Sequence, residues 1–434
     1  MGYALFNKGF AYLNIYIGTP IFIGEICLIT GIILLFRSYL IPLKKFTLFI
    51  LVLIFFIIGT INFIANFPQF GVEALRDYAM IYYSLFFFLC FHLNNVCESN
   101  ELKKLLKRLS LVVPIYFVFT FLLDKLLPNW QGVIIVPGTN TPFFFNKMGD
   151  SGVWLSAIIS FVFIFSDEYN IYEKIFISIV SLIIFSQIFA INRGGAISLI
   201  FSTTLILVRY INLKFFMYFF FFFTLLLGVI FFVDIKLGQG SSLEDYEHRE
   251  FSTMQIRNNI KSFFVKSDQS DGDLGGTKEW RLLMWATIIN DVTSEPNLFF
   301  KGIGLGPSLL KIYDEFEIAE ADESKITKHP HNFIINIFAR LGIFGFISIM
   351  LILLYVIYTI YNFYQIPRKL LFNEKFKIYA ILLIFVVAAL FNSNFDIYLE
   401  GPMGAIPFWC MLGFAYAQKN RLNKQIKSQI LMGK

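Results

Sequence analysis

The sequence predicts an all-α, polytopic membrane protein with about 11 (10–12) transmembrane helices and one large polar loop on the outer side. Hydrophobic residues make up 57% of the 434-residue chain, charged residues make up 15%, and the mean hydropathy is +0.67. A soluble domain carries roughly 25% charged residues, so this chain cannot cover itself with polar groups in water. Apolar stretches recur along the chain, and one long polar segment, residues 234–330, interrupts them.

The apolar stretches are of a length to cross a bilayer, because a hydrocarbon core of ~30 Å requires about 20 helical residues. Residues 9–19 are a candidate for an additional half-span, which leaves the predicted number of spans uncertain by one. The predicted spans lie near residues 20–36, 46–66, 75–96, 109–127, 150–166, 175–192, 194–209, 214–233, 331–362, 377–398 and 402–418.

Basic residues between the spans predict the orientation, because Lys and Arg collect in cytoplasmic loops. This assignment places residues 67–75, 128–149, 234–330 and 394–401 on the outer side. The loop at 167–174 fits least well, since it has three acidic residues and one Lys. The basic clusters contain Arg37, Lys44 and Lys45; Lys103, Lys104, Lys107 and Arg108; Arg209 and Lys214; Arg368, Lys369, Lys375 and Lys377; and, in the tail, Lys419, Arg421, Lys424 and Lys427.

The chain has no internal repeat, so we expect one membrane domain in three parts. These are the N-terminal helices of 1–233, the loop of 234–330, and the C-terminal helices and basic tail of 331–434. Within the loop, apolar spacing predicts a helix near 279–291, and residues 244–263 are a candidate for a second, surface helix.

Several classes of function receive no support from the composition. The net charge of +6 comes from short loops between spans and does not indicate nucleic-acid binding. The four Cys lie in or beside apolar runs, so neither a disulfide framework nor a thiolate metal site is expected. The N-terminus lacks the features of a signal peptide, and we expect the first span to be retained.

Two arginines on the predicted outer side, Arg76 and Arg193, stand against the charge rule and are candidates for a site. Arg193 lies between two spans and is followed by Gly194 and Gly195. A guanidinium in such a turn can bind phosphate through two parallel hydrogen bonds, which Lys cannot reproduce. The alternative for Arg193 is that its side chain reaches out to lipid headgroups.

The C-terminal third of the loop provides a second set of candidates. Arg281 and Trp285 share the predicted helix, and Gly302, Gly304 and Gly306 follow it. Backbone amides in a glycine run can bind phosphate or an oxyanion. The run is no dinucleotide fingerprint, because no strand–turn–helix unit surrounds it, and on its own it is typical of a tight turn.

His331 and Asn332 stand where an apolar helix begins again. A helix N-terminus disfavours the imidazolium, which leaves His331 able to accept a proton; a cap or interface role is the alternative. His329 and His331 do not predict a metal site, since no acidic partner lies at ligand spacing.

Arg340 lies farther along the same helix, at a depth where ionisable groups usually face the bundle interior. It is a candidate for contact with substrate. An ion pair with Glu25, Asp396 or Glu400 would instead make it structural.

Taken in order, these features resemble the bacterial O-antigen polymerase and O-antigen ligase superfamily. Arg193 is followed by glycines, Arg281 and Trp285 come next, and Gly302, Gly304 and Gly306 precede His331-Asn332 with Gly342 and Gly345. The resemblance covers essentially the whole chain and is most specific over residues 190–196 and 280–345. Proteins of this family have many spans and one large periplasmic loop before the last few.

The resemblance implies a multi-pass glycosyltransferase of the bacterial inner membrane whose site faces the periplasm. It implies transfer of glycan from an undecaprenyl pyrophosphate carrier to a sugar hydroxyl, with inversion and without a metal or other cofactor. Partners would be the lipid-linked oligosaccharide and the bilayer, with a chain-length regulator protein left open. Catalysis would rest on Arg193, Arg281 and His331, and substrate binding on Arg76, Trp285, Gly302, Gly304, Gly306, Asn332 and Arg340.

Three other functions stay open beside an O-antigen polymerase: a ligase, a transporter and a scaffold protein. The first is an O-antigen ligase, which transfers glycan to lipid A–core; we favour the polymerase because such proteins are often rich in Phe, Ile and Lys. The second is a lipid-linked oligosaccharide transporter, although transporters tend to have internal repeats and midplane charges. A scaffold protein whose loop binds partners would need none of the candidate residues for glycan transfer.

Overall fold

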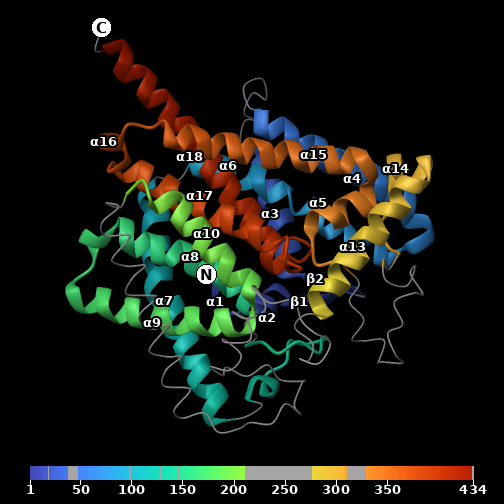
Figure 1. Cartoon of the computed structure of the whole chain (residues 1–434), viewed down its shortest axis with the longest axis horizontal. Coiled ribbons are helices and arrows are strands. Elements are labelled where there is room, and N and C mark those ends of the chain that lie inside the picture. Colours follow the sequence, from blue (N-terminus) through green and yellow to red (C-terminus); the bar gives the residue numbers. More distant parts are fainter. Residues whose placement is uncertain are drawn as a thin grey trace.

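The computed structural model describes residues 1–17, 19–37, 47–96, 99–127, 130–144, 147–210, 276–307, 309 and 329–432 (Figure 1). Within them the regular structure is helical apart from one small hairpin and an isolated bridge, which confirms the predicted all-α class. The predicted span at 214–233 and the predicted helix at 244–263 lie outside the described residues.

Ten of the eleven predicted spans coincide with described helices, and the structure differs near the N-terminus. Residues 9–19 do not form a half-span; they belong to a short helix and to a hairpin of β1 (Asn14–Ile17) and β2 (Thr19–Phe22). The main helices are α3 (Ile23–Arg37), α4 (Thr47–Phe70), α5 (Val72–Tyr82), α6 (Leu85–Val96), α7 (Ser99–Leu126), α8 (Met148–Ile164), α9 (Ile171–Ile191), α10 (Arg193–Leu207), α15 (Phe333–Tyr364), α17 (Glu374–Asn392) and α18 (Pro402–Met432). The short ones are α1 (Gly2–Leu5), α2 (Asn7–Ala11), η2 (Trp130–Val133), η3 (Ser166–Glu168) and α16 (Arg368–Leu371).

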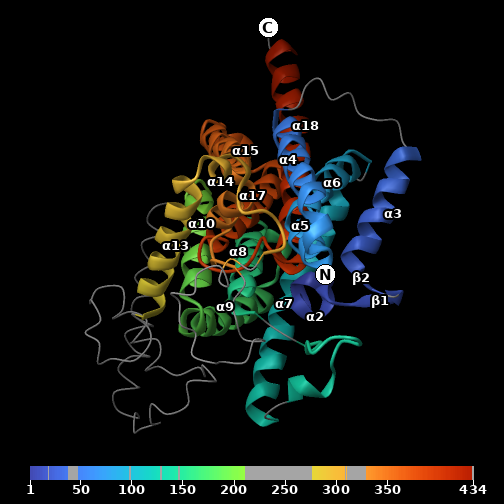
Figure 2. The same cartoon turned by 90° about the vertical axis from the view of Figure 1, so that its right-hand side faces the viewer.

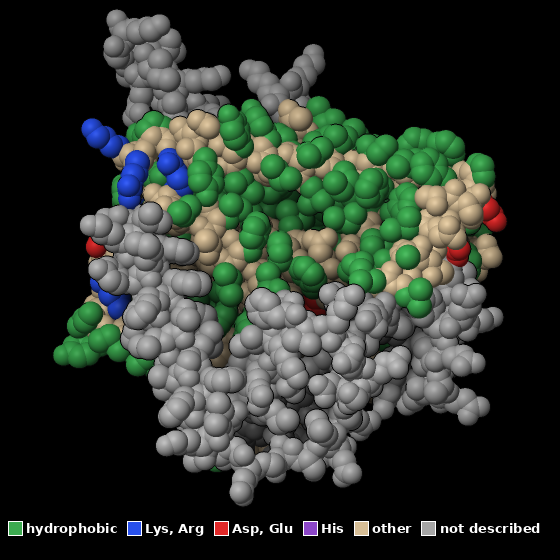
Figure 3. Space-filling view, viewed as in Figure 1, with side chains coloured by type: hydrophobic (Ala, Val, Ile, Leu, Met, Phe, Trp, Pro, Cys, Tyr) green, Lys and Arg blue, Asp and Glu red, His purple; other side chains and the backbone are tan. Residues whose placement is uncertain are grey.

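The surface of the helix bundle is apolar, as expected for contact with lipid. Among the described residues, four helical segments are long and apolar enough to cross a membrane: Thr47–Phe70, Val72–Asn94, Ile171–Phe189 and Phe333–Tyr364. On α15 the exposed side chains Phe344, Ile347, Leu351 and Leu354 recur every three or four residues, where a water-facing helix would carry charges. Figure 3 shows hydrophobic side chains covering the face formed by α15 and its neighbour α4.

The basic loops meet at one end of the molecule. Lys103 at the start of α7 pairs with Glu168 at 2.6 Å and with Glu374 at 3.0 Å, so three loops lie together there. The acidic loop at 167–174, which fits the charge rule least well, therefore lies among basic residues, and Lys107 also contacts Glu168 at 3.3 Å. Lys and Arg side chains gather at the end that carries α16 (Figures 1 and 3).

The polar loop contains the predicted helix. It forms as α13 (Gly276–Ser294) and is followed by the short α14 (Pro296–Lys301). Met284, Ile288 and Val292 are fully buried in a cluster with Ala339 of α15, so α13 packs on α15 through one face. Figure 2 shows α13 at one edge of the molecule and α3 at the opposite edge.

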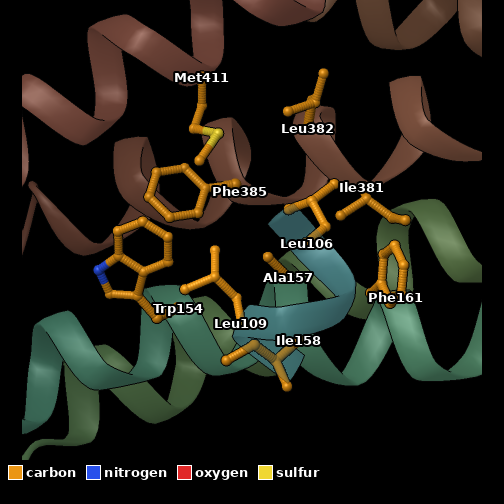
Figure 4. Close-up of a pocket in the computed structure, with 10 residues that line it drawn as sticks. All are labelled: Leu106, Leu109, Trp154, Ala157, Ile158, Phe161, Ile381, Leu382, Phe385 and Met411. Atoms are coloured by element: carbon orange, nitrogen blue, oxygen red, sulfur yellow. The ribbon is translucent and has the colours of Figure 1, made fainter. Parts of the chain in front are cut away.

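Helix α17 lies at the centre of the bundle, where it packs against α8, α10 and α18. A small cavity remains between α7, α8, α17 and α18 (Figure 4). Its ten lining residues, which include Trp154, Phe385 and Met411, are all apolar. With a volume of about 10 Å³ it has room for at most about one water molecule, so it is too small for a substrate.

Candidate functional site

The candidate site lies at the end of the bundle opposite α16, where several helices begin. Lys147 is the N-cap residue of α8, Asn192 that of α10 and Asn332 that of α15. The segment 393–401, between α17 and α18, runs among them. Each helix N-terminus carries a partial positive charge, so their convergence favours an anion.

Glycines allow α8 and α10 to begin this close together. A Cβ atom on Gly152 would lie 2.8 Å from the carbonyl oxygen of Gly195, and one on Gly195 would lie 2.8 Å from Cα of Gly149. The Asn192 side chain accepts a hydrogen bond from Gly195 N at 2.9 Å and thereby caps α10. The glycines after Arg193 thus determine where α10 starts relative to α8.

Asp396 is the hub of the site, although nothing in its sequence context predicts a catalytic role. Its carboxylate contacts Lys147 Nζ at 2.8 Å and accepts a hydrogen bond from Asn192 at 3.2 Å. His331 Nδ1 lies 3.9 Å from it, a close contact longer than a hydrogen bond. Burial alone would raise the pKa of Asp396, but His331 and Lys147 outweigh burial and hold the pKa well below its usual range.

His331 joins the site from the start of α15. Its φ of 53° lies in the left-handed region, which few residues other than glycine adopt, and the chain turns there into the helix. Asn332 then caps α15 by accepting a hydrogen bond from Ile335 N at 3.1 Å. The His331 side chain is 21% exposed, so the ring can reach a ligand while its Nδ1 faces Asp396.

Arg281 reaches the same segment from α13, and the first turn of α10, which begins at Arg193, packs against it. Arg281 Nη1 donates a hydrogen bond of 3.0 Å to the carbonyl oxygen of Phe395. Gly194, next to Arg193, packs so closely on Phe395 that an added Cβ would lie 2.6 Å from its Cβ. Trp285 fixes α13 by donating a hydrogen bond of 2.7 Å to the Pro330 carbonyl. The structure therefore brings Arg281, His331 and the start of α10 at Arg193 around residues 395–396.

Two more buried carboxyl groups lie near Asp396, and the sequence did not predict either as a residue of the site. Asp150 in the first turn of α8 accepts a hydrogen bond of 3.0 Å from Asn7, which lies in the N-terminal segment. Glu400 is 9% exposed, and burial raises its pKa to about 8. A group with that pKa holds its proton at neutral pH.

The other predicted substrate contacts lie elsewhere. Arg76 is exposed on α5, directly before Asp77. Arg340 is 1% exposed and pairs with Asp77 at 2.7 Å. The partners considered from the sequence, Glu25, Asp396 and Glu400, were therefore wrong, because helix α5 packs where Arg340 points.

The three loop glycines already donate their amides to the protein. Gly302 N bonds to Leu298 O at 2.8 Å, Gly304 N to Arg340 O at 3.1 Å, and Gly306 N to Asp77 at 2.9 Å. A phosphate would have to displace these acceptors. This geometry favours a structural role for Gly302, Gly304 and Gly306.

Comparison with known protein families gives a match to part of the chain. The model of the O-antigen ligase family matches residues 178–350. That range contains Arg193, Arg281 and His331, while Lys147 and Asp396 lie outside it. No curated protein matches the chain.

Proposed function

This chain belongs to the O-antigen polymerase and ligase superfamily, and on that premise we propose that it is an O-antigen polymerase or a polymerase of a related surface polysaccharide. The family supports glycan transfer by a membrane enzyme in general. The finer proposal is that an undecaprenyl pyrophosphate-linked glycan is passed to a sugar hydroxyl of a second lipid-linked unit, at the periplasmic face of the inner membrane.

The observation that carries this proposal is the convergence of Arg193, Arg281 and His331 on residues 395–396. The three residues are far apart in the sequence, yet Arg281 contacts Phe395, Gly194 packs on Phe395, and His331 lies beside Asp396. Two arginines and a histidine close to one junction of helix N-termini suit a reaction that has an anionic donor.

The negative charge of the leaving group explains how the site would bind the donor. The leaving pyrophosphate is a concentrated anion, and two guanidinium groups at the N-termini of α8, α10 and α15 can stabilise it as the glycosidic bond breaks. Arginine suits this task because its planar fork binds two phosphate oxygens at once. Arg193 and Arg281 thus stabilise the charge that a metal ion would otherwise neutralise.

His331 explains how the site would activate the acceptor hydroxyl. The attacking hydroxyl oxygen forms a bond to the anomeric carbon while the bond from that carbon to the pyrophosphate oxygen breaks, and the hydroxyl proton passes to the imidazole. Asp396, 3.9 Å from Nδ1, orients the ring and stabilises the imidazolium that forms. A single displacement of this kind inverts the anomeric configuration.

Reconstitution with lipid-linked repeat units, with and without lipid A–core, tests the proposed function. A polymerase yields a ladder of lipid-linked chains without lipid A–core, and the new linkage has the opposite anomeric configuration to the carrier-linked sugar. Glycan attached only to lipid A–core would make the protein a ligase. Translocation without any new glycosidic bond would make it a transporter, and retained configuration would exclude the single displacement.

A further inference from the structure

A second buried polar cluster surrounds Arg340, away from the hub at Asp396. Its guanidinium contacts Asp77 at 2.7 Å and donates hydrogen bonds to Asn336 Oδ1 at 3.0 Å, Gly304 O at 3.3 Å and Pro307 O at 3.2 Å. With a side chain 1% exposed and four protein acceptors, Arg340 has no face left for an anionic ligand.

Asp77 completes the same cluster from α5. The oxygen that pairs with Arg340 also accepts the hydrogen bond of Gly306 N at 2.9 Å. Arg340 and Asp77 therefore hold both the carbonyl and the amide groups of the turn at residues 302–307. An ion pair between two helices thus fixes a piece of the polar loop.

The backbone of α15 is shaped to receive this turn. Gly342, with φ 62°, interrupts the helix, and the nearby carbonyl groups of Ala339 and Arg340 accept hydrogen bonds from Ile303 N at 2.7 Å and Gly304 N at 3.1 Å. A side chain on Gly342 would collide with the carbonyl oxygens of Phe299 and Phe300 in α14. Asn62 of α4 adds a hydrogen bond to Lys301 O at 3.1 Å.

We propose that Arg340 and Asp77 form a positioning pair that places Arg281 in the site by clamping the turn at 302–307. The turn follows α14 and α13 directly, and α13 packs on Ala339 through Met284, Ile288 and Val292. Holding the turn therefore holds the helix from which Arg281 reaches Phe395. Arg340, in this view, acts through Arg281 and touches no substrate. The effect on transfer rate rests on the proposed function, whereas the clamp on the turn does not.

The clamp is tested by hydrogen exchange on purified Asp77→Asn, which keeps the shape of the side chain and removes its charge. We expect amide exchange over residues 303–306 and along α13 to be at least about tenfold faster than in the wild type, with α17 unchanged. Unchanged exchange in the turn would overturn the clamp. Glu101→Gln is the matched control, because it removes an exposed ion pair with Lys104 and should leave exchange and transfer unchanged.

The coupling to Arg281 is tested by a double-mutant cycle on transfer rate. Arg340→Gln should lower kcat by about tenfold in the wild-type background and by less than about twofold in an Arg281→Ala background, since the two changes act on one step. Equal losses in both backgrounds would overturn the proposal and assign Arg340 an independent role. If Arg340→Gln does not accumulate in the membrane, Asp77→Asn replaces it in the same cycle. If the wild type transfers no glycan in any assay while Asp77→Asn still exchanges faster in the turn, the proposed function is refuted and the clamp is not.

Discussion

At the scale of single residues, the candidate site joins charged groups that lie far apart in the sequence: Arg281 contacts Phe395, and Lys147 and His331 lie beside Asp396. Arg193 stands out in the sequence because it opposes the charge rule, Arg281 because a glycine run follows its helix, and His331 because it precedes an apolar helix. The structure places Arg281 at Phe395 and His331 beside Asp396, while Gly194, next to Arg193, packs on Phe395. Asp396 is suggested by the sequence only as a possible partner for Arg340. Its contact with Lys147 depends on packing between distant helices, which the sequence alone does not reveal.

The arginines provide the first prediction. Replacing Arg193 or Arg281 by Lys keeps the charge but removes the planar fork, so transfer from the pyrophosphate donor should slow by at least about tenfold. Initial rates at saturating acceptor measure the effect. Arg108→Lys is the control, since Arg108 is exposed on α7 among the basic loops; an equal loss there would contradict the assignment.

Glu400 gives a prediction about pH and stability. Its folded-state pKa of about 8 exceeds the value of about 4.3 expected in an unfolded chain, so the folded protein binds more protons between these values. The free energy of unfolding should therefore fall as pH rises from about 4 to 8 and level off above it. Glu400→Gln removes this dependence. The Tm of the purified variant should therefore exceed the Tm of the wild type by a margin that grows from pH 5 to pH 8. Parallel curves for the two proteins would show that Glu400 ionises normally in the fold.

At the scale of helices and strands, apolar length and spacing predict most elements. The helix expected near 279–291 is present as α13, and ten predicted spans coincide with helices. The half-span at 9–19 was wrong, because its apolar residues form a hairpin whose Asn14 bonds to Pro137 O across the chain. The sequence also did not predict the interruption of α15 at Gly342, because the residues that pack against it come from the distant polar loop.

The crossing of α8 and α10 leads to a prediction at this scale. Gly195→Ala places a methyl group against Gly149, so the two helix N-termini must separate and Asn192 must move with them. We expect a loss of about 1–3 kcal/mol in the free energy of unfolding together with a lower transfer rate. Gly132→Ala is the matched control, because a Cβ there meets nothing within 4 Å. Equal stability of both variants would show that the glycine contact is not needed.

At the scale of the whole molecule, charge and hydropathy predict an arrangement with two distinct ends. Lys103, Glu168 and Glu374 lie together at one end, and Lys147, His331 and Asp396 lie together at the other. Among the described residues, these loops alternate between the two ends as the chain proceeds. The sequence could predict this because each span must cross the same apolar thickness.

Thiol labelling in whole cells tests the orientation. In a variant without the native cysteines, Glu295→Cys should react with a membrane-impermeant reagent from outside once the outer membrane is permeable to it. Lys369→Cys should react only after the inner membrane is opened, because α16 belongs to the basic end that the charge rule predicts to be cytoplasmic. The reverse pattern would place the site in the cytoplasm. The native cysteines to be replaced are Cys27, Cys90, Cys97 and Cys410.

The most direct test of the central claim is a double-mutant cycle on His331 and Asp396, measured as the initial rate of glycan transfer in reconstituted membranes. His331→Ala should lower the rate by about 10²- to 10⁴-fold, as expected when a general base is lost. Asp396→Asn should cost at least about tenfold, as when a carboxylate that orients a catalytic histidine is removed. The double variant should then be no slower than His331→Ala alone, because Asp396 acts through His331. Full activity of His331→Ala, or losses that multiply in the double variant, would contradict the account.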